Sequence, residues 1–156
     1  LRGRHAELDE GLLQGGLCAL CGDLGGQQEA LGGSQGSFAA GTNCGVAFVA
    51  PSNGKVYATV SGHMETNNTV ESAYLSYEIR TGSTVGSGTV FFAAVTDYGI
   101  GIGGTGTVAR ICSSRRKLIT GLSPGGAYNI RTMHICTGGT YDIFAREILV
   151  EPVKAP

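Results

Sequence analysis

The sequence has no tryptophan, only 4 prolines among 156 residues, and charged side chains at only 15% of positions. The formal net charge is -1, whereas domains that bind nucleic acid carry a basic face. No apolar run approaches the length of about 20 residues that a membrane-spanning helix needs, and the N-terminus lacks the basic and then apolar order of a signal peptide. We therefore expect a soluble chain that is not exported by the Sec route and that binds neither nucleic acid nor membranes.

The five cysteines lack the even count and the regular spacing of a disulfide framework. Cys18 and Cys21 form a Cys-x-x-Cys pair, but no second close pair of cysteines or histidines accompanies them, and a structural zinc site takes four ligands. Apolar packing is the simpler interpretation of this pair. We expect reduced, buried thiols and no metal site.

Residue types that carry out catalysis are not grouped in this sequence. The three histidines are far apart, and only His63 has a nearby acid, Glu65. Residues 99–104 match Gly-x-Gly-x-x-Gly, but a dinucleotide site needs a helix after the glycines, and residues 105–108 have β character. We interpret residues 99–104 as a flexible loop or a bulged strand edge. We predict no catalytic residue, no bound cofactor and no enzymatic activity.

The 27 glycines, set beside so few prolines, indicate tight turns and bulges rather than a disordered tract. From Cys44 to Val153, short stretches of alternating apolar and polar residues are separated by turn dipeptides, which is typical of a compact all-β sandwich. The stretches that we predict as strands are 44–50, 56–64, 73–80, 89–95, 105–112, 117–120, 127–136 and 141–150. The predicted fold is all-β: an antiparallel Greek-key β-sandwich of about eight strands in residues 41–156, with a short N-terminal helical or extended arm.

The strands differ in how many of their faces are apolar. In the second and third strands one face should point to the core, and its residues are Val56, Ala58, Val60, Gly62, Met64, Ala73, Leu75, Tyr77 and Ile79. The last two strands are apolar on both faces, so either the second sheet and a loop or another subunit covers them. We favour another subunit. The predicted oligomer contacts are Met133, Ile135, Ile143 and Leu149.

Three polar segments predict turns between these strands. Residues 51–54 read Pro-Ser-Asn-Gly and should join the first two strands as a hairpin, because the Asn-Gly pair accepts positive φ. Residues 113–116 form a second predicted turn. Residues 121–128 carry a Leu-x-Pro-Gly turn followed by a tyrosine, similar to a tyrosine corner, in which the phenol bonds back to nearby backbone. The predicted structural corner consists of Leu122, Pro124 and Tyr128.

Residues 1–40 differ in composition and are predicted to be a docking or oligomerisation arm with a linker. Residues 4–14 can form a short helix, and residues 17–31 place Leu, Cys, Leu, Gln and Leu at heptad spacing. The glycines among them each cost up to about 1 kcal/mol of helix propensity relative to alanine. The segment is either an arm that becomes ordered against partners or a frayed tail. Its predicted contacts are Leu8, Leu12, Leu17, Leu20, Leu24 and Leu31.

One basic cluster stands out from the weakly charged background. Arg110 precedes the run Arg115, Arg116 and Lys117. The cluster is either a solvated turn or a group that forms salt bridges to an acidic patch on a neighbouring subunit.

Several segments of the sandwich region resemble, in the same order, one family of proteins. They are residues 55–64, Leu-Ser-Tyr-Glu-Ile-Arg at 75–80, Gly-Ser-Gly-Thr-Val at 86–90, Leu-Ile-Thr-Gly-Leu-Ser-Pro-Gly at 118–125, Arg-Thr-Met-His at 131–134 and Arg-Glu-Ile-Leu-Val-Glu-Pro-Val at 146–153. They resemble the C-terminal β-sandwich domain of virion structural proteins from actinobacterial tailed phages, which are minor tail, fibre or capsid-decoration components. The resemblance covers roughly residues 41–153. It implies a jelly-roll-like trimer displayed on the virion surface, and it brings no catalytic residues.

The function that this resemblance implies is structural. We expect a trimeric capsid decoration (cementing) or head-fibre protein on the outside of the particle, in contact with sister copies and with the major capsid protein or with tail or collar proteins. Only about 40 residues precede the sandwich, without a collagen-like repeat or long coiled stem, which favours a short docking arm over a long fibre. The alternative is a tail-fibre or minor tail protein whose sandwich binds a host cell-surface glycan. Its aromatic platforms would be Tyr57, Tyr74 and Tyr98.

Overall fold

The protein is described from a computed structural model, which places residues 19–22, 29–32, 37–40, 44–66, 72–103 and 108–154. These residues form antiparallel strands and one 3-10 turn, η1 (Thr96–Tyr98). Within these ranges, no helix is long and apolar enough to cross a membrane. The strands are β1 (Ala19–Gly22), β2 (Glu29–Gly32), β3 (Gly45–Val49), β4 (Val56–Thr66), β5 (Ser72–Thr81), β6 (Val90–Phe92), β7 (Ile100–Gly103), β8 (Ala109–Ile119), β9 (Ala127–Cys136) and β10 (Thr140–Pro152).

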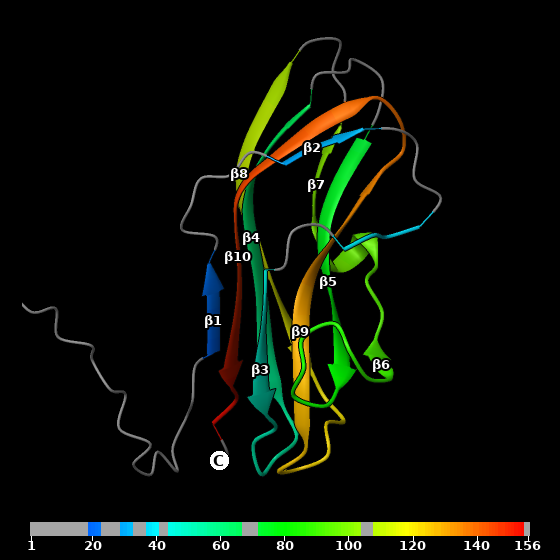
Figure 1. Ribbon diagram of the computed structural model, residues 1–156. Coiled ribbons are helices and arrows are strands. Elements are labelled where there is room, and N and C mark those ends of the chain that lie inside the picture. The colour runs from blue at the N-terminus through cyan, green and yellow to red at the C-terminus, as the bar shows by residue number, and fades with distance from the viewer. Residues whose placement is uncertain are drawn as a thin grey trace, which may run out of the picture.

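The strands form two sheets that face each other as a sandwich (Figure 1). Sheet A has the order β1-β10-β4-β8, with β2 also paired to β10. Sheet B has the order β3-β9-β5-β6, with β7 also paired to β5. If β1 with β2, and β6 with β7, are each counted as one interrupted strand, the two sheets have four strands apiece in the order of a jelly roll. The predicted fold class is therefore confirmed.

The segment assigned to the arm contributes to sheet A. β1 pairs with the second half of β10, from Val150 to Glu147, and β2 pairs with its first half, from Thr140 to Ile143. The coiled-coil interpretation of residues 17–31 is wrong for these two stretches, because both are extended strands. The glycines of this segment weaken a helix. The free edge of β10, in contrast, provides hydrogen-bond partners for the backbone N–H and C=O groups of β1 and β2. The predicted helix at residues 4–14 lies outside the described residues.

The predicted turn at residues 113–116 is wrong. β8 runs without interruption from Ala109 to Ile119 and pairs with β4 along its whole length. Its middle residues are polar because β8 is an edge strand of sheet A and its middle is exposed, not because the chain turns. The two predicted strands 105–112 and 117–120 are therefore parts of one strand in the described region.

The turn at residues 51–54 is present, but the hairpin is not. Gly54 has a φ of 62°, and its N–H donates to the carbonyl of Pro51 at 2.9 Å. The strands on either side belong to different sheets, because β3 pairs with β9 and β4 pairs with β10 and β8. The turn therefore carries the chain across the sandwich.

The core lies between the sheets and follows the predicted alternation. All nine residues predicted to face the core from β4 and β5 are buried. The outer face of β5 is less exposed than predicted, since Ser76 and Glu78 are also buried. Gly62 is required at its position, because a Cβ there would lie 2.7 Å from the side chain of Leu75 in the facing sheet.

Candidate interaction surface

The predicted tyrosine corner is present at the start of β9. The phenol oxygen of Tyr128 accepts a hydrogen bond of 3.0 Å from the backbone N–H of Ser123. Its ring stacks on Phe48 of β3, with 5.9 Å between ring centroids, and contacts Phe91 of β6 edge to face at 5.4 Å. Leu122 is buried beside it, and Pro124 is exposed in the turn. The corner thus joins three strands at one end of the sandwich.

That same end exposes large apolar side chains, and we call it the apolar end. Its members are Val49, Val90, Phe91 and Leu118, which are between 38% and 67% exposed. Their strand positions place them at one end of the sandwich, near the turns at residues 50–55 and 120–126. Val49 lies opposite Ala127 and Val90 opposite Arg80 on the side of sheet B, and Leu118 lies opposite Tyr57 on the outer face of sheet A. Exposed apolar groups that gather in one region mark contact surfaces more often than scattered ones do.

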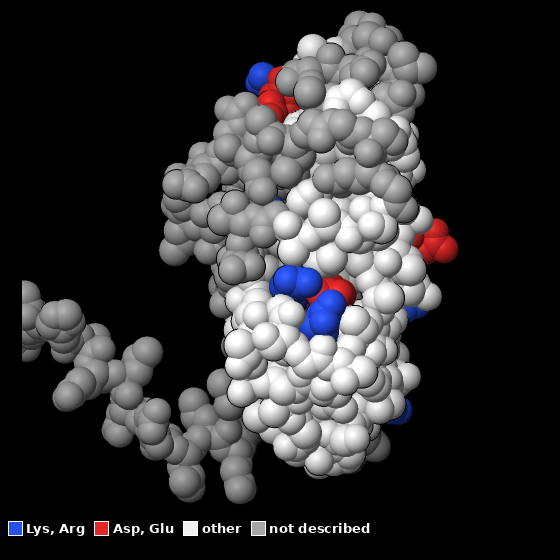
Figure 2. All heavy atoms as spheres, turned by 45° about the vertical axis from the view of Figure 1, so that its right-hand side comes forward, with Lys and Arg blue, Asp and Glu red and all other residues white. Residues whose placement is uncertain are grey.

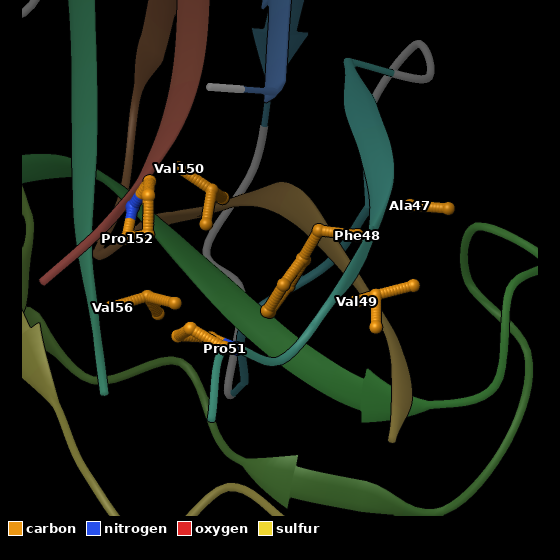
Figure 3. A pocket seen from close by; sticks show the side chains of 7 residues that line it. All are labelled: Ala47, Phe48, Val49, Pro51, Val56, Val150 and Pro152. Atoms are coloured by element: carbon orange, nitrogen blue, oxygen red, sulfur yellow. The ribbon is translucent and has the colours of Figure 1, made fainter. Parts of the chain in front are cut away.

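A pocket of about 210 Å³ lies beside the apolar end, between the edge of β3 and strands β4 and β10. Its lining is uncharged and consists of Ala47, Phe48, Val49, Pro51, Val56, Val150 and Pro152. Figure 3 shows the ring of Phe48 pointing toward Pro51, whereas Ala47 and Val49 point away from Val150 and Pro152. The pocket lies at the edge of β3, to which no second strand is paired in the described part of the chain.

The outer face of sheet B holds one cluster of charges, which we call the ion-pair cluster. Nε of Arg80 and Nε of Arg131 lie 2.7 and 2.6 Å from the same carboxylate oxygen of Glu78. Figure 2 shows this side of the molecule as largely uncharged, with a small group of basic and acidic atoms near its middle. The Glu78 side chain is only 6% exposed. Burial would raise the pKa of Glu78, but hydrogen bonds from Arg80 and Arg131 outweigh burial, and the pKa lies below its ordinary value.

The ion-pair cluster is continuous with the loop of residues 82–88. Arg80 donates from Nη1 to the carbonyl of Gly88, and the buried side chain of Asn129 donates to the carbonyls of Gly82 and Ser87. The N–H of Gly86 donates back to Oδ1 of Asn129 at 2.9 Å. These bonds hold the loop against β9. A loop of this chain therefore covers part of the outer face that the sequence assigned to a second subunit.

The basic cluster lies on β8 rather than in a turn. On the outer face of sheet A, Arg110 pairs with Glu65 at 2.8 Å and Arg116 pairs with Glu151 at 3.1 Å. Arg115 and Lys117 lie opposite Val60 and Ala58, which face the core, so both charges are on the inward side of an edge strand. Inward charges of this kind prevent a further strand from adding to an edge.

The tyrosines proposed as glycan platforms each have a ring face in contact with the chain itself. The guanidinium of Arg116 lies 4.1 Å from the ring centroid of Tyr57, and Nζ of Lys117 lies 4.2 Å from that of Tyr98. The ring of Tyr74 lies so close to Gly101 that a Cβ there would be 2.6 Å from it. Only one face of each ring is left for stacking on a sugar.

The predicted contact residues fall into four groups. Ile143 and Met133 are buried in this chain, at 0% and 7% exposure, so their side chains are not available to another subunit. Ile135 and Leu149 are half-buried. Leu20 and Leu31 lie in β1 and β2, with their backbones opposite Leu149 and Tyr141. The remaining predicted contacts lie outside the described residues: Leu8, Leu12, Leu17 and Leu24.

Sequence analysis missed the apolar end. Val90, Phe91 and Phe92 are consecutive, so at least one of them must be exposed on a strand with one buried face. This run of three apolar residues was the feature of the sequence that could have predicted an exposed apolar side chain here. Phe92 stacks on Tyr77 at 5.8 Å and packs against the core, whereas Phe91 lies in a register irregularity between Val90 and Phe92, contacts Tyr128 and stays 38% exposed.

The groups considered for chemistry are dispersed. Cys44 and Cys136 are buried, and Cys112 is exposed. His63 packs on Phe144, while the neighbouring Glu65 is held by Arg110. Among the described residues, no three His, Cys, Asp or Glu side chains are grouped as a metal site. Within the Gly-x-Gly-x-x-Gly string, β7 pairs with β5 as an edge strand, so the phosphate-loop geometry is not formed there.

Comparison with known proteins gives no family for this chain. No family model and no curated protein matches it. Among solved structures, it is similar to a chain in the structure of infectious bursal disease virus Gt strain, with 12% identity and a TM-score of 0.29 over all of this chain and 46% of that one. A chain of the T=1 particles derived from Infectious Bursal Virus matches 90% of this chain and 41% of its own length, with 11% identity and a TM-score of 0.24. The chain spans less than half the length of either protein, and likenesses of this strength carry no argument about fold or function.

Proposed function

We propose that this chain is a non-enzymatic structural protein of a bacteriophage virion, which assembles as a trimer and decorates the outside of the capsid. The observation that carries the proposal is the apolar end. It presents Val49, Val90, Phe91 and Leu118, which are four of the six large apolar side chains that are exposed among the described residues. The resemblance of the sandwich segments to virion proteins of actinobacterial phages supplies the kind of particle and the trimer.

The fold agrees with this proposal without deciding it. Jelly rolls are frequent in viral capsid domains, but they also occur in lectins and cupins, so the surface has to supply the argument. The apolar end is suited to docking on another protein, because burial of apolar area contributes about 25 cal/mol per Å² before the entropy of association is subtracted. Repetition of this contact at many symmetric sites would cement the shell.

Glycan binding is the weaker proposal. Such sites commonly use exposed aromatic platforms, and here Tyr57, Tyr74 and Tyr98 each pack one ring face against Arg116, Gly101 and Lys117. We therefore keep it as an outcome of the test below.

The test has two parts. Electron microscopy of purified particles should show density of this protein at every local three-fold axis or capsomer centre. Density confined to the tail tip or collar would overturn the decoration proposal and favour host recognition.

The second part uses a matched pair of variants on β8. Leu118 lies at the apolar end and Val108 precedes the opposite end of the same strand, and both are exposed. We expect Leu118→Ser to weaken co-sedimentation with particles that lack the protein by several-fold, and Val108→Ser to leave it unchanged. Equal binding of the two variants would show that the apolar end is not the docking surface.

A further inference from the structure

The four strand edges of the two sheets are not equally protected. β8 carries inward charges, Arg115 and Lys117, and charges on an edge discourage strand addition. The edge formed by β6 and β7 is interrupted by η1, and the edge formed by β1 and β2 is made of two four-residue pieces. Short and interrupted edges are likewise poor templates. β3 carries no inward charge and is not interrupted.

The free side of β3 can be assigned from its hydrogen bonds. The carbonyl of Cys44 accepts from the N–H of Thr132, and the N–H of Ala50 donates to the carbonyl of Gly126. In an antiparallel pair the bonded residues alternate, so the even-numbered residues of β3 bond to β9. The N–H and C=O groups of Gly45, Ala47 and Val49 therefore point away from β9, toward an edge to which no described strand is hydrogen-bonded, with β1 of the facing sheet close by.

We propose that this edge of β3 pairs antiparallel with β3 of a second copy, across a two-fold axis at Ala47. The sequence of the strand is self-complementary in that register. Ala47 would lie opposite Ala47 of the second copy, and Gly45 opposite Val49, with each such pair exchanging two hydrogen bonds. No charged side chain or proline interrupts Gly45–Val49.

Packing on both faces of the strand supports a second copy as the occupant. On the outer face, Gly45 has no room for a Cβ, which would lie 2.6 Å from Cγ1 of Val85. Val49 of the second copy, which is 67% exposed in the isolated chain, would therefore rest on Gly45 and Val85. On the inner face, the same register places Val46 of the second copy opposite Phe48, which lines the pocket. Pairing would thus close the apolar pocket.

The contact is weak in solution and is strengthened by crowding on a particle. A five-residue strand pair buries less than the roughly 1,200 Å² that stable interfaces usually reach. Anchoring many copies to one shell raises their effective concentration, and weak contacts then add avidity. The two-fold contact is separate from the proposed three-fold assembly and would link neighbouring trimers. It does not depend on the virion proposal, since it follows from β3 alone.

Residue-resolved amide hydrogen exchange on the full chain tests the contact, because β3 contains its own control. The N–H groups of Val46 and Phe48 bond to β9 in every state and should exchange slowly at any concentration. The N–H groups of Ala47 and Val49 should exchange rapidly in dilute protein and at least several-fold more slowly as concentration rises from micromolar to millimolar. Slow exchange of both at all concentrations would mean that another part of the same chain covers the edge. Association without protection of Ala47 and Val49 would mean that another surface is used. Either result, or rapid exchange of both at every concentration, overturns the inference and leaves the virion proposal standing.

Two variants, each with a matched control, test the contact without hydrogen exchange. Ala47→Pro removes only an N–H that faces the free edge, whereas Ala47→Val keeps it. Light scattering at high concentration should therefore show self-association through the two-fold contact, that is, association beyond the proposed trimer, lost in the first and kept in the second. Val49→Lys should also abolish it, while Ala127→Lys, which places the same charge one strand away from the edge on the exposed Ala127, should not. Native-like far-UV circular dichroism of the two loss variants confirms that they fold. Self-association that survives both Ala47→Pro and Val49→Lys would refute the inference.

Discussion

Replacement of Glu78 by glutamine should be the most costly conservative change on the outer face of sheet B. Glutamine keeps the shape of the side chain and one acceptor oxygen, but it removes the charge that pairs with Arg80 and Arg131. Breaking a buried ion pair by removing one partner costs about 3 to 5 kcal/mol. Arg80 and Arg131 are 23% and 19% exposed and reach some water, so we expect the lower value, about 3 kcal/mol. For a domain of this size that is on the order of 10 °C in Tm.

The matched control is Glu151→Gln. Glu151 pairs with Arg116 at 3.1 Å, but their side chains are 34% and 52% exposed, and surface pairs contribute less than about 1 kcal/mol. Urea unfolding of the two variants at neutral pH measures the difference directly. If Glu78→Gln costs no more than Glu151→Gln, the ion-pair cluster is not a source of stability and the argument from burial fails.

The pH dependence of the stability difference between wild type and Glu78→Gln gives a second test. The pKa of Glu78 is lower in the folded state than in the unfolded chain, so its contribution is complete above the unfolded pKa and is lost as the pH falls through the folded pKa. The stability difference between wild type and Glu78→Gln should therefore be constant from neutral pH to about pH 5 and shrink below about pH 4. A difference that stays constant to the lowest pH at which the protein folds would contradict the assigned charge state.

Three further predictions follow from particular contacts. The first two can be checked by chemical or thermal unfolding, and the third by turbidity. Tyr128→Phe removes the acceptor for the N–H of Ser123 and should lower the free energy of unfolding by about 1 kcal/mol. Tyr77→Phe should leave it unchanged or raise it slightly, because the buried phenol of Tyr77 has no hydrogen-bond partner among the described residues. A larger loss of stability in Tyr77→Phe than in Tyr128→Phe would refute both assignments. Gly88→Ala should cost more than about 2 kcal/mol, since φ is +92° and a Cβ would collide with the carbonyl oxygen of Thr81, while Gly125→Ala, with positive φ but open space, should cost about 1 kcal/mol. The double variant Arg115→Val and Lys117→Val should fold but aggregate, as followed by turbidity, because it removes the inward charges of the β8 edge; solubility equal to that of wild type would show that these charges do not protect it.

Local patterns in the sequence predicted the parts of the fold that depend on near neighbours. The inward faces of β4 and β5 were predictable because apolar residues alternate over the whole length of each strand. The tyrosine corner was predictable because Ser123 and Tyr128 are close in sequence. The all-β sandwich followed from the number and spacing of the strands, and the jelly-roll class was implied by the resemblance of the sandwich segments to phage virion proteins.

Long-range pairing explains what the sequence did not reveal. β1 and β2 are four-residue strands that depend on β10, more than a hundred residues later, so their local composition carries no β signal. Glu78 and Arg131 are 53 positions apart, and only the register of β5 against β9 brings them together. β8 was divided in two because a charged middle is typical of a turn, and its position at the edge of sheet A, which makes those charges acceptable, is a property of the whole fold.

The distribution of charge gives the molecule an orientation on a surface. On the outer face of sheet A, Arg110 and Arg116 pair with Glu65 and Glu151 from β4 and β10, so this face is polar and suited to water. On sheet B the ion-pair cluster lies beneath the loop of residues 82–88, and the edge at β3 is uncharged. A molecule that docks through its apolar end, to which Leu118 at one end of sheet A belongs, would keep the rest of this polar face in solvent and leave the β3 edge, at its side, free to meet the β3 edge of a neighbour. Docking and edge pairing share Val49 but otherwise use different groups, so Leu118→Ser should lower particle binding without changing exchange at Ala47, and Ala47→Pro should do the reverse. If either variant affected both measurements equally, the apolar end and the β3 edge would have to be regarded as one surface with one partner.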